Sequence, residues 1–336
     1  MNDPSQRVAS DDELAALRDA ADLPALIDAL VRRGATALEQ ADWALAQRDL
    51  DEAATVAELA GKLALAAQAH VAVATALRGD GQLAAATARA EHAVALAPDG
   101  PPRIAALTAL GECHRAAGSS AAAEAAYAEA LTGARAAHML PFHQAALLRR
   151  RAEALRSLGR IDEATAALTA AIDAYRGIGA DEPLRDTLVE RAAALVDAAA
   201  PAWTEAIAAG RTAAAAVGDH ARLAELAVLE ATRATAAGDV AAAISWAERA
   251  RQHALDGDSP ITYTAAAIAI ADLKERTGDR VGAYASLAVG WVTLGDVLGQ
   301  DTAAAWFRPQ LLAARERWGE AGFQAAKDAY YATLTA

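Results

Sequence analysis

The clearest pattern of apolar, small and polar positions lies in residues 107–130, in a fixed frame around Gly118. Gly111 stands seven residues before Gly118, whereas Ala123 and Tyr127 stand five and nine residues after it. A glycine between two such stretches permits the positive φ of a tight turn, and small residues let two helix backbones approach closely. The pattern therefore predicts two antiparallel helices that meet at Gly111 and Ala123, with the Tyr127 ring filling the gap beside them.

The same frame recurs along most of the chain. Glycines also occupy the expected turns at Gly81, Gly159, Gly238 and Gly278, whereas Arg48 replaces the turn glycine of a degenerate first copy, and Ala200-Pro201 forms a weaker fifth turn. The alanines that align the copies lie at positions 53, 86, 123, 164, 206, 243 and 283, at intervals of 33, 37, 41, 42, 37 and 40 residues. Because repeats of this length bury their apolar faces on their neighbours, we expect one extended domain.

These small residues at fixed offsets from a turn resemble the tetratricopeptide repeat (TPR), whose period is 34 residues. The resemblance implies an all-α fold: a right-handed superhelical solenoid of about seven TPR-like helical hairpins with helical caps. The longer intervals are similar to the extended repeats in the helical regions of bacterial MalT- and LuxR-type regulators. Those regulators also carry a nucleotide-binding domain and a DNA-binding helix-turn-helix, and we expect neither in this sequence.

Both ends of the array are predicted to be helical caps. Ser10 and Glu13 have the spacing of a capping box, which predicts a helix through Ala20, and Leu23-Pro24 begins a second one. We expect a mobile N-terminal tail over residues 1–9 and an N-terminal helical cap over 10–33. The repeat array then spans 34–301, and a C-terminal helical cap spans 302–336.

Composition and charge narrow the class of protein. Hydrophobic residues make up 54% of the chain but aromatic residues only 4%, which favours closely packed helices over strands. A net charge of -13 argues against nucleic acid as a partner, since phosphate binding requires clustered Lys and Arg. The N-terminus lacks the pattern of a signal peptide, so we expect a cytoplasmic protein. The weakly charged run 281–295 is shorter than the roughly 20 residues that cross a bilayer, and predicts a buried repeat helix rather than a membrane span.

Motifs for catalysis, nucleotide binding and metal binding are missing from the sequence. Gly61-Lys62 lacks the preceding glycine of a P-loop, and neither an H-E-x-x-H nor a G-x-S-x-G motif occurs. Cys113 is the single cysteine and lies within a predicted helix, which indicates a buried structural thiol. His138 and His143 flank a short loop, but two histidines without an acidic or thiolate companion make a poor metal site. We therefore expect no cofactor, no metal and no enzymatic activity.

Arginines recur at one position of the predicted first helices, three residues before the turn glycine. Arg78, Arg115 and Arg156 occupy this position in three consecutive repeats, Glu112 and Glu153 precede two of them by three residues, and Arg149 lies one turn before Glu153. The TPR resemblance implies that this side of the first helix lines a concave groove, where such arginines would bind a peptide carboxylate or acidic side chains. The alternative is that Glu112–Arg115 and Glu153–Arg156 are ordinary pairs on solvated helices, each worth roughly 0.2–0.5 kcal/mol.

Aromatic residues gather near the C-terminus, where nine of the fifteen lie from residue 263 onward. Large rings close the end of a solenoid well, so a dense cap is one interpretation. The other is a surface for a partner or for self-association, because Trp and Tyr are favoured interface residues. The candidates for such a surface are Trp306, Phe307, Trp318 and Tyr330.

The sequence thus favours a non-catalytic scaffold or adaptor that binds a protein or peptide segment, acidic in the simplest case, along the concave groove. The alternative is a regulatory module that responds to a small ligand or a signal peptide and acts on a partner protein. An all-α enzyme is a third and less favoured reading, because no acid, base and nucleophile converge at a recognisable spacing.

Overall fold

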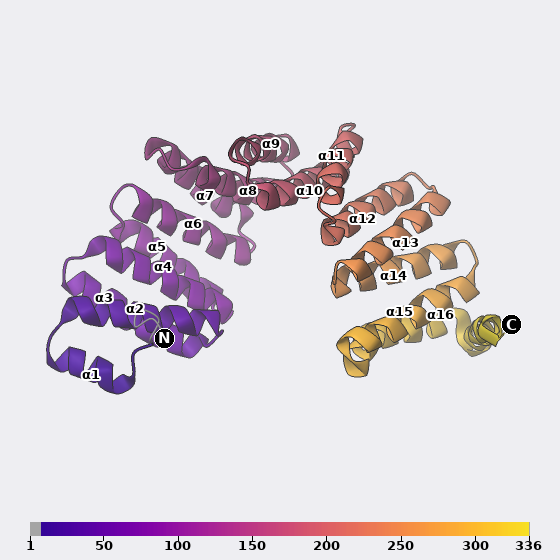
Figure 1. Cartoon of the computed structure of the whole chain (residues 1–336), viewed down its shortest axis with the longest axis horizontal. Coiled ribbons are helices and arrows are strands. Elements are labelled where there is room, and N and C mark those ends of the chain that lie inside the picture. Colours follow the sequence, from indigo (N-terminus) through magenta and orange to yellow (C-terminus); the bar gives the residue numbers. More distant parts are fainter. Residues whose placement is uncertain (1–7, 336) are drawn as a thin grey trace. The chain divides into compact units, whose positions relative to one another are not determined.

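A computed structural model of the chain describes residues 8–335 and places sixteen helices and no strand in them. This confirms the predicted all-α class. The chain divides into two compact units, Met1–Ala180 and Asp181–Ala336 (Figure 1). The N-terminal tail expected over residues 1–9 falls mostly on residues 1–7, which lie outside the described residues.

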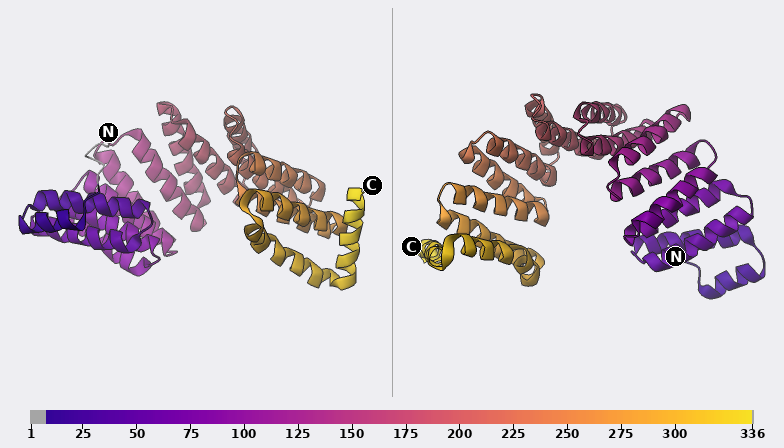
Figure 2. Two further views of the ribbon diagram at one scale, coloured as in Figure 1. Left: turned by 60° about the horizontal axis from the view of Figure 1, so that its bottom comes forward. Right: turned by 180° about the vertical axis from the view of Figure 1, so that it is seen from behind.

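The first unit is a stack of antiparallel helices, each joined to the next by a short turn (Figure 2). Its helices are α1 (Asp11–Asp19), α2 (Leu23–Glu39), α3 (Trp43–Leu59), α4 (Leu63–Gly79), α5 (Leu83–Leu96), α6 (Pro101–Ala116), α7 (Ser120–Ala136), α8 (Pro141–Ser157) and α9 (Ile161–Ile178). They pair as hairpins α2/α3, α4/α5, α6/α7 and α8/α9, and α1 packs on α2.

The second unit repeats the same arrangement. Its helices are α10 (Asp181–Asp197), α11 (Trp203–Ala215), α12 (His220–Ala236), α13 (Val240–Asp256), α14 (Pro260–Arg276), α15 (Arg280–Leu298) and α16 (Gln300–Thr335). They form hairpins α10/α11, α12/α13 and α14/α15, and α16 packs on α15. The described residues therefore contain seven hairpins, as the repeat predicted.

The register predicted for the first repeat was wrong. Helix α3 runs without interruption through Arg48, and the turn lies at Ala41, whose φ is 57°. With the turn at Ala41, Gly34 stands seven residues before it and Leu50 nine after, and the Leu50 side chain packs against Gly34. This is the Gly111–Tyr127 relationship with leucine in place of tyrosine. The turn escaped notice because alanine takes the left-handed conformation there, which costs about 1–2 kcal/mol and is usually left to glycine.

Alanine forms the core where the helices of a hairpin cross. The predicted crossing residues in the later repeats are at most 2% exposed: Ala86, Ala123, Ala164, Ala206, Ala243 and Ala283. In the first repeat, the corrected register gives this place to Ala46, which is fully buried. Close approach of two backbones requires side chains no larger than this, so the recurring alanines determine how tightly each hairpin closes.

The ends of the array are built as two additional helical segments. Ser10 and Glu13 form the predicted capping box, each side chain bonding the other residue's backbone N–H, and α1 follows. The expected boundary between residues 33 and 34 falls inside α2 rather than between helices. At the other end α16 contains a break at Gly319, whose φ is 70°, so residues 300–335 form two helical segments.

Among the described helices, α15 is long and apolar enough, by length and composition alone, to cross a membrane. It packs against both α14 and α16, and it buries Ala283, Leu287 and Leu294. A central helix of a helical repeat has the same composition, so these contacts favour the predicted reading of this segment as a repeat helix.

Candidate functional site

The polar residues predicted to line the groove all lie on first helices of consecutive hairpins in the first unit. Arg78 is on α4, Glu112 and Arg115 are on α6, and α8 carries Arg149, Glu153 and Arg156. The structure joins α6 and α8 through some of these side chains and leaves Arg78 apart from them.

Glu112 is the centre of a hydrogen-bonded cluster between α6, α7 and α8. Its Oε2 accepts a hydrogen bond from Arg115 Nη2 at 2.8 Å, and its Oε1 accepts one from Tyr127 Oη at 3.0 Å and one from Arg150 Nε at 2.9 Å. A further hydrogen bond joins α6 to α8, from Arg115 Nη1 to Glu153 Oε1 at 3.4 Å. The predicted Glu112–Arg115 pair therefore exists, and it is part of a larger bridge between neighbouring hairpins.

Two members of this cluster were missed by sequence reasoning. Arg150, which was not among the predicted residues, reaches Glu112, because the rotation of α8 turns position 150 toward α6. Tyr127 was predicted only as a packing residue, yet its hydroxyl group also bonds Glu112. The signal available for Tyr127 was its polar tip on an otherwise apolar helix face.

The cluster keeps Glu112 ionised. Burial is the largest single influence and acts to raise the pKa of Glu112, but the hydrogen bond and charge of Arg115, with Tyr127 and Arg150, together lower that pKa. The same hydrogen bond to Glu112 raises the pKa of Arg115 further above its ordinary value. The charges of Arg115 and Arg150 then balance those of Glu112 and Glu153. Arg115 therefore does not offer the unpaired guanidinium group that the predicted groove needs to bind an acidic segment.

Arg78 differs from Arg115. Among the residues that the structure describes, no carboxylate pairs with Arg78, and its side chain is half-buried on α4. It lies close enough to Cys113 to act on the thiol, although burial dominates and raises the pKa of Cys113. Cys113 is 1% exposed, which matches the predicted structural thiol. Arg78 is thus the predicted anchor with an uncompensated charge.

Arginine–carboxylate pairs also connect first helices in the second unit. Arg222 of α12 donates to Asp186 of α10 at 2.5 Å, and Arg185 of α10 donates to Asp219, the N-cap residue of α12, at 3.1 Å. Ion pairs of this kind fix how consecutive hairpins stack, because each pair joins two first helices at a defined position along their axes.

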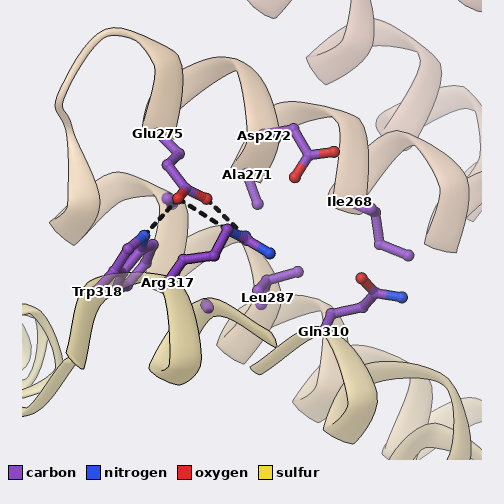
Figure 3. A pocket seen from close by; sticks show the side chains of 10 residues that line it. Ile268, Ala271, Asp272, Glu275, Leu287, Gln310, Arg317 and Trp318 are labelled. Carbon is purple, nitrogen blue, oxygen red and sulfur yellow. Dashed lines mark hydrogen bonds and ion pairs between the residues drawn. The ribbon is translucent and has the colours of Figure 1, made fainter. Parts of the chain in front are cut away.

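A small pocket lies between α14, α15 and α16 (Figure 3). At one end Glu275 accepts hydrogen bonds from Arg317 Nη2 at 2.7 Å and from Trp318 Nε1 at 2.6 Å. At the other end Asp272 and Gln310 contribute polar groups. The cavity volume is about 10 Å³, which is room for about one water molecule and far below the roughly 300–1,000 Å³ of small-molecule sites. This pocket is therefore too small for a small-molecule ligand.

The C-terminal aromatic residues form a core. Phe307 is fully buried against Gly290, where an added Cβ would lie 2.6 Å from the ring, and Trp318 is 8% exposed. Trp306 and Tyr330 are partly buried against the same cluster. Phe307 and Trp318 therefore belong to the interior of this unit rather than to an accessible surface, which favours the cap interpretation of the segment.

No protein-family model and no curated protein matches the sequence. Solved structures do match the fold, at low sequence identity. The apo form of RapI matches with a TM-score of 0.61 and 10% identity, covering 93% of this chain and 82% of that one.

Two further structures match comparably. Aspartyl phosphate phosphatase F from Bacillus subtilis gives a TM-score of 0.57 at 13% identity, over 82% of this chain and 73% of that one. NprR in complex with its cognate peptide NprX gives a TM-score of 0.50 at 14% identity, over 92% of this chain and 88% of that one. At such identities the likeness concerns the fold alone, and it confirms that this chain has the fold of TPR-like helical-repeat proteins.

Proposed function

We propose that this chain is a non-catalytic module that binds a peptide or protein segment along the first helices of its repeats. The observation that carries the proposal is the likeness in fold, over 92% of the chain, to a protein whose solved structure holds a peptide. Neighbouring first helices within each unit are also linked by ion pairs, Arg150–Glu112 in the first unit and Arg222–Asp186 in the second, so each unit presents a polar face there. An extended chain can be held along such a face by hydrogen bonds and charge.

Arg78 is the proposed anchor for an acidic group of that segment. Its charge has no carboxylate partner among the described residues, whereas Arg115 already bonds Glu112 and Glu153. A free guanidinium group on a half-buried surface gains more from a partner carboxylate than one that must first give up its own pair. Arg149 and Arg156 remain proposed members of the same face on α8.

A regulatory role is the second candidate function. The similar solved structures include an apo form described as the quorum sensor NprR, and NprR with its cognate peptide, which favours a peptide that acts as a signal. The finer resemblance to MalT- and LuxR-type regulators stays a prediction, as does a cytoplasmic location.

Peptide selection against the whole chain tests the proposal. Random peptides displayed on phage are selected on the immobilised protein, resynthesised, and titrated by calorimetry against the wild type, Arg78→Ala and Arg135→Ala. Arg135 is the control, since it is an exposed arginine on the second helix α7. We expect acidic peptides whose affinity falls about tenfold or more in Arg78→Ala, the value of one charged hydrogen bond, and is unchanged in Arg135→Ala.

Two different negative results are possible, and each contradicts a different part of the proposal. If no selected peptide binds in the calorimeter, the proposed function itself is contradicted. If peptides bind equally well to the wild type and to Arg78→Ala, peptide binding stands and the anchor assigned to Arg78 is contradicted. Added salt should weaken the binding, because the contacts are partly exposed.

A further inference from the structure

Four of the seven histidines of this chain gather in two clusters with carboxylates. One cluster, in the first unit, consists of Glu58, His70 and His92, and the other, in the second unit, consists of His220, His253 and Asp256. The first cluster is the better formed, because three different helices supply it and one of its histidines is buried.

The first cluster brings together three atoms that can bind a metal ion. Glu58 Oε1, on α3, lies 2.5 Å from His70 Nε2, on α4, and 3.4 Å from His92 Nε2, on α5. The two imidazole rings meet edge to face, with their centroids 4.7 Å apart. His70 is 2% exposed, whereas the side chains of His92 and Glu58 are 48% and 35% exposed, so one side of the cluster is open to solvent.

We propose that Glu58, His70 and His92 form a Zn²⁺ site that joins α3, α4 and α5, with a water molecule in the open fourth position. Two imidazole nitrogens and one carboxylate oxygen are a ligand set that Zn²⁺ accepts, and tetrahedral bonds of about 2.0–2.1 Å place the ligand atoms roughly 3.3 Å apart. The short contact between Glu58 and His70 must open by less than about 1 Å, and the three ligand atoms all lie within 4.8 Å of one another, so small side-chain movements reach that geometry.

The positively charged Arg89 opposes the binding of Zn²⁺, so it should lower the affinity of the site for the ion. The Nη1 group of Arg89 lies 3.2 Å from His70 Nδ1, and Nη2 lies 2.8 Å from Asp51 Oδ1. Because a guanidinium group can only donate, Nδ1 accepts this bond and the ring proton sits on Nε2, facing Glu58. Binding of Zn²⁺ at Nε2 moves that proton to Nδ1, so Arg89 must leave His70 while keeping Asp51.

Calorimetric titration of the full chain, without an affinity tag, with Zn²⁺ tests the site, and Co²⁺ provides visible absorption bands that report tetrahedral nitrogen and oxygen ligands. A His253→Gln background removes the second cluster from the stoichiometry. In that background we expect one Zn²⁺ per chain, and a loss of affinity beyond about 100-fold in His92→Gln, since even outer-shell changes cost 10–100-fold. His143→Gln, an exposed histidine of the same unit, should bind as the background protein does.

Arg89→Gln should change the Zn²⁺ affinity in the opposite direction, so it distinguishes loss of a ligand from damage to the fold. Removing the competing donor should tighten Zn²⁺ binding by about tenfold, which a merely damaged protein would not do. Glu58→Gln replaces His92→Gln if the latter does not fold, as judged by circular dichroism. The proposal is overturned if Zn²⁺ gives no heat above the buffer blank, or if His92→Gln and His143→Gln bind it equally. Neither result bears on peptide binding.

Discussion

The ring of Tyr127 lies directly on the Cα of Gly111, where a Cβ atom would come within 2.8 Å of the ring carbon Cζ. The two residues come from the two helices of one hairpin, and the hydroxyl group of the same tyrosine bonds Glu112, the residue that follows Gly111 in α6. One side chain thus closes the hairpin through its ring and supports the bridge to α8 through its tip. The apolar packing and the polar face of the third repeat therefore depend on each other.

Gly111→Ala should destabilise the protein by about 1–3 kcal/mol, because the new methyl group overlaps a ring that is fully buried and cannot move aside. Gly177→Ala is the matched control. Gly177 also lies in a helix, and nothing lies within 4 Å of an added Cβ there. It should be neutral or stabilising by up to about 1 kcal/mol. Urea unfolding of both variants measures the difference, and equal losses of stability would contradict the close approach at Gly111.

Ala123→Leu should cost about 1–3 kcal/mol, because Ala123 is 0% exposed at the crossing of α6 and α7. Ala121 lies two residues earlier on the same helix and is exposed. Ala121→Leu should therefore change the free energy of unfolding little. Thermal and urea unfolding of the pair check the rotation of α7 about its axis. A larger loss at position 121 than at 123 would show that the helix presents another face to α6.

The repeat frame could be predicted wherever glycine marks the turn, as at Gly118 and Gly238, because positive φ favours one residue type. It failed at Ala41, where the surrounding packing imposes the same conformation on alanine. The offset of seven residues from Gly34 to that turn was the signal that could have corrected it.

The site was harder to predict than the fold. Which residues of α8 face α6 depends on helix rotation, which sequence spacing fixes only to within one position, so the contact of Arg150 with Glu112 was not predicted. Glu58, His70 and His92 belong to no motif. Their convergence depends on the relative height of α3, α4 and α5, a property of three-dimensional packing that spacings of 12 and 22 residues do not reveal.

Removal of residues 300–336 should impair the second unit. Phe307 and Trp318 cover Gly290 and the facing side of α14 and α15, so the shortened chain exposes that apolar surface. We expect lower solubility, self-association in size-exclusion chromatography and a broader unfolding transition, as solenoids show without their terminal repeats. A shortened chain that stays monomeric and unfolds as sharply as the wild type would mean that the aromatic residues serve a partner instead of a cap.

Glu112→Gln should reveal a stability contribution that depends on pH. The folded protein lowers the pKa of Glu112, so it favours the ionised carboxylate, and the stabilisation is complete at pH values above the ordinary pKa of about 4.3. It is lost as the pH falls below that value and through the lowered pKa of the folded state. The variant, which cannot ionise, should be less stable than the wild type by about 1–3 kcal/mol at neutral pH, and the difference should shrink in acid.

Glu153→Gln is the control. The Glu153 side chain is 49% exposed, so its substitution should cost under about 1 kcal/mol. Urea unfolding at a series of pH values gives both curves. If the difference between wild type and Glu112→Gln is the same at neutral and acidic pH, the charge of Glu112 does not stabilise the bridge between α6 and α8.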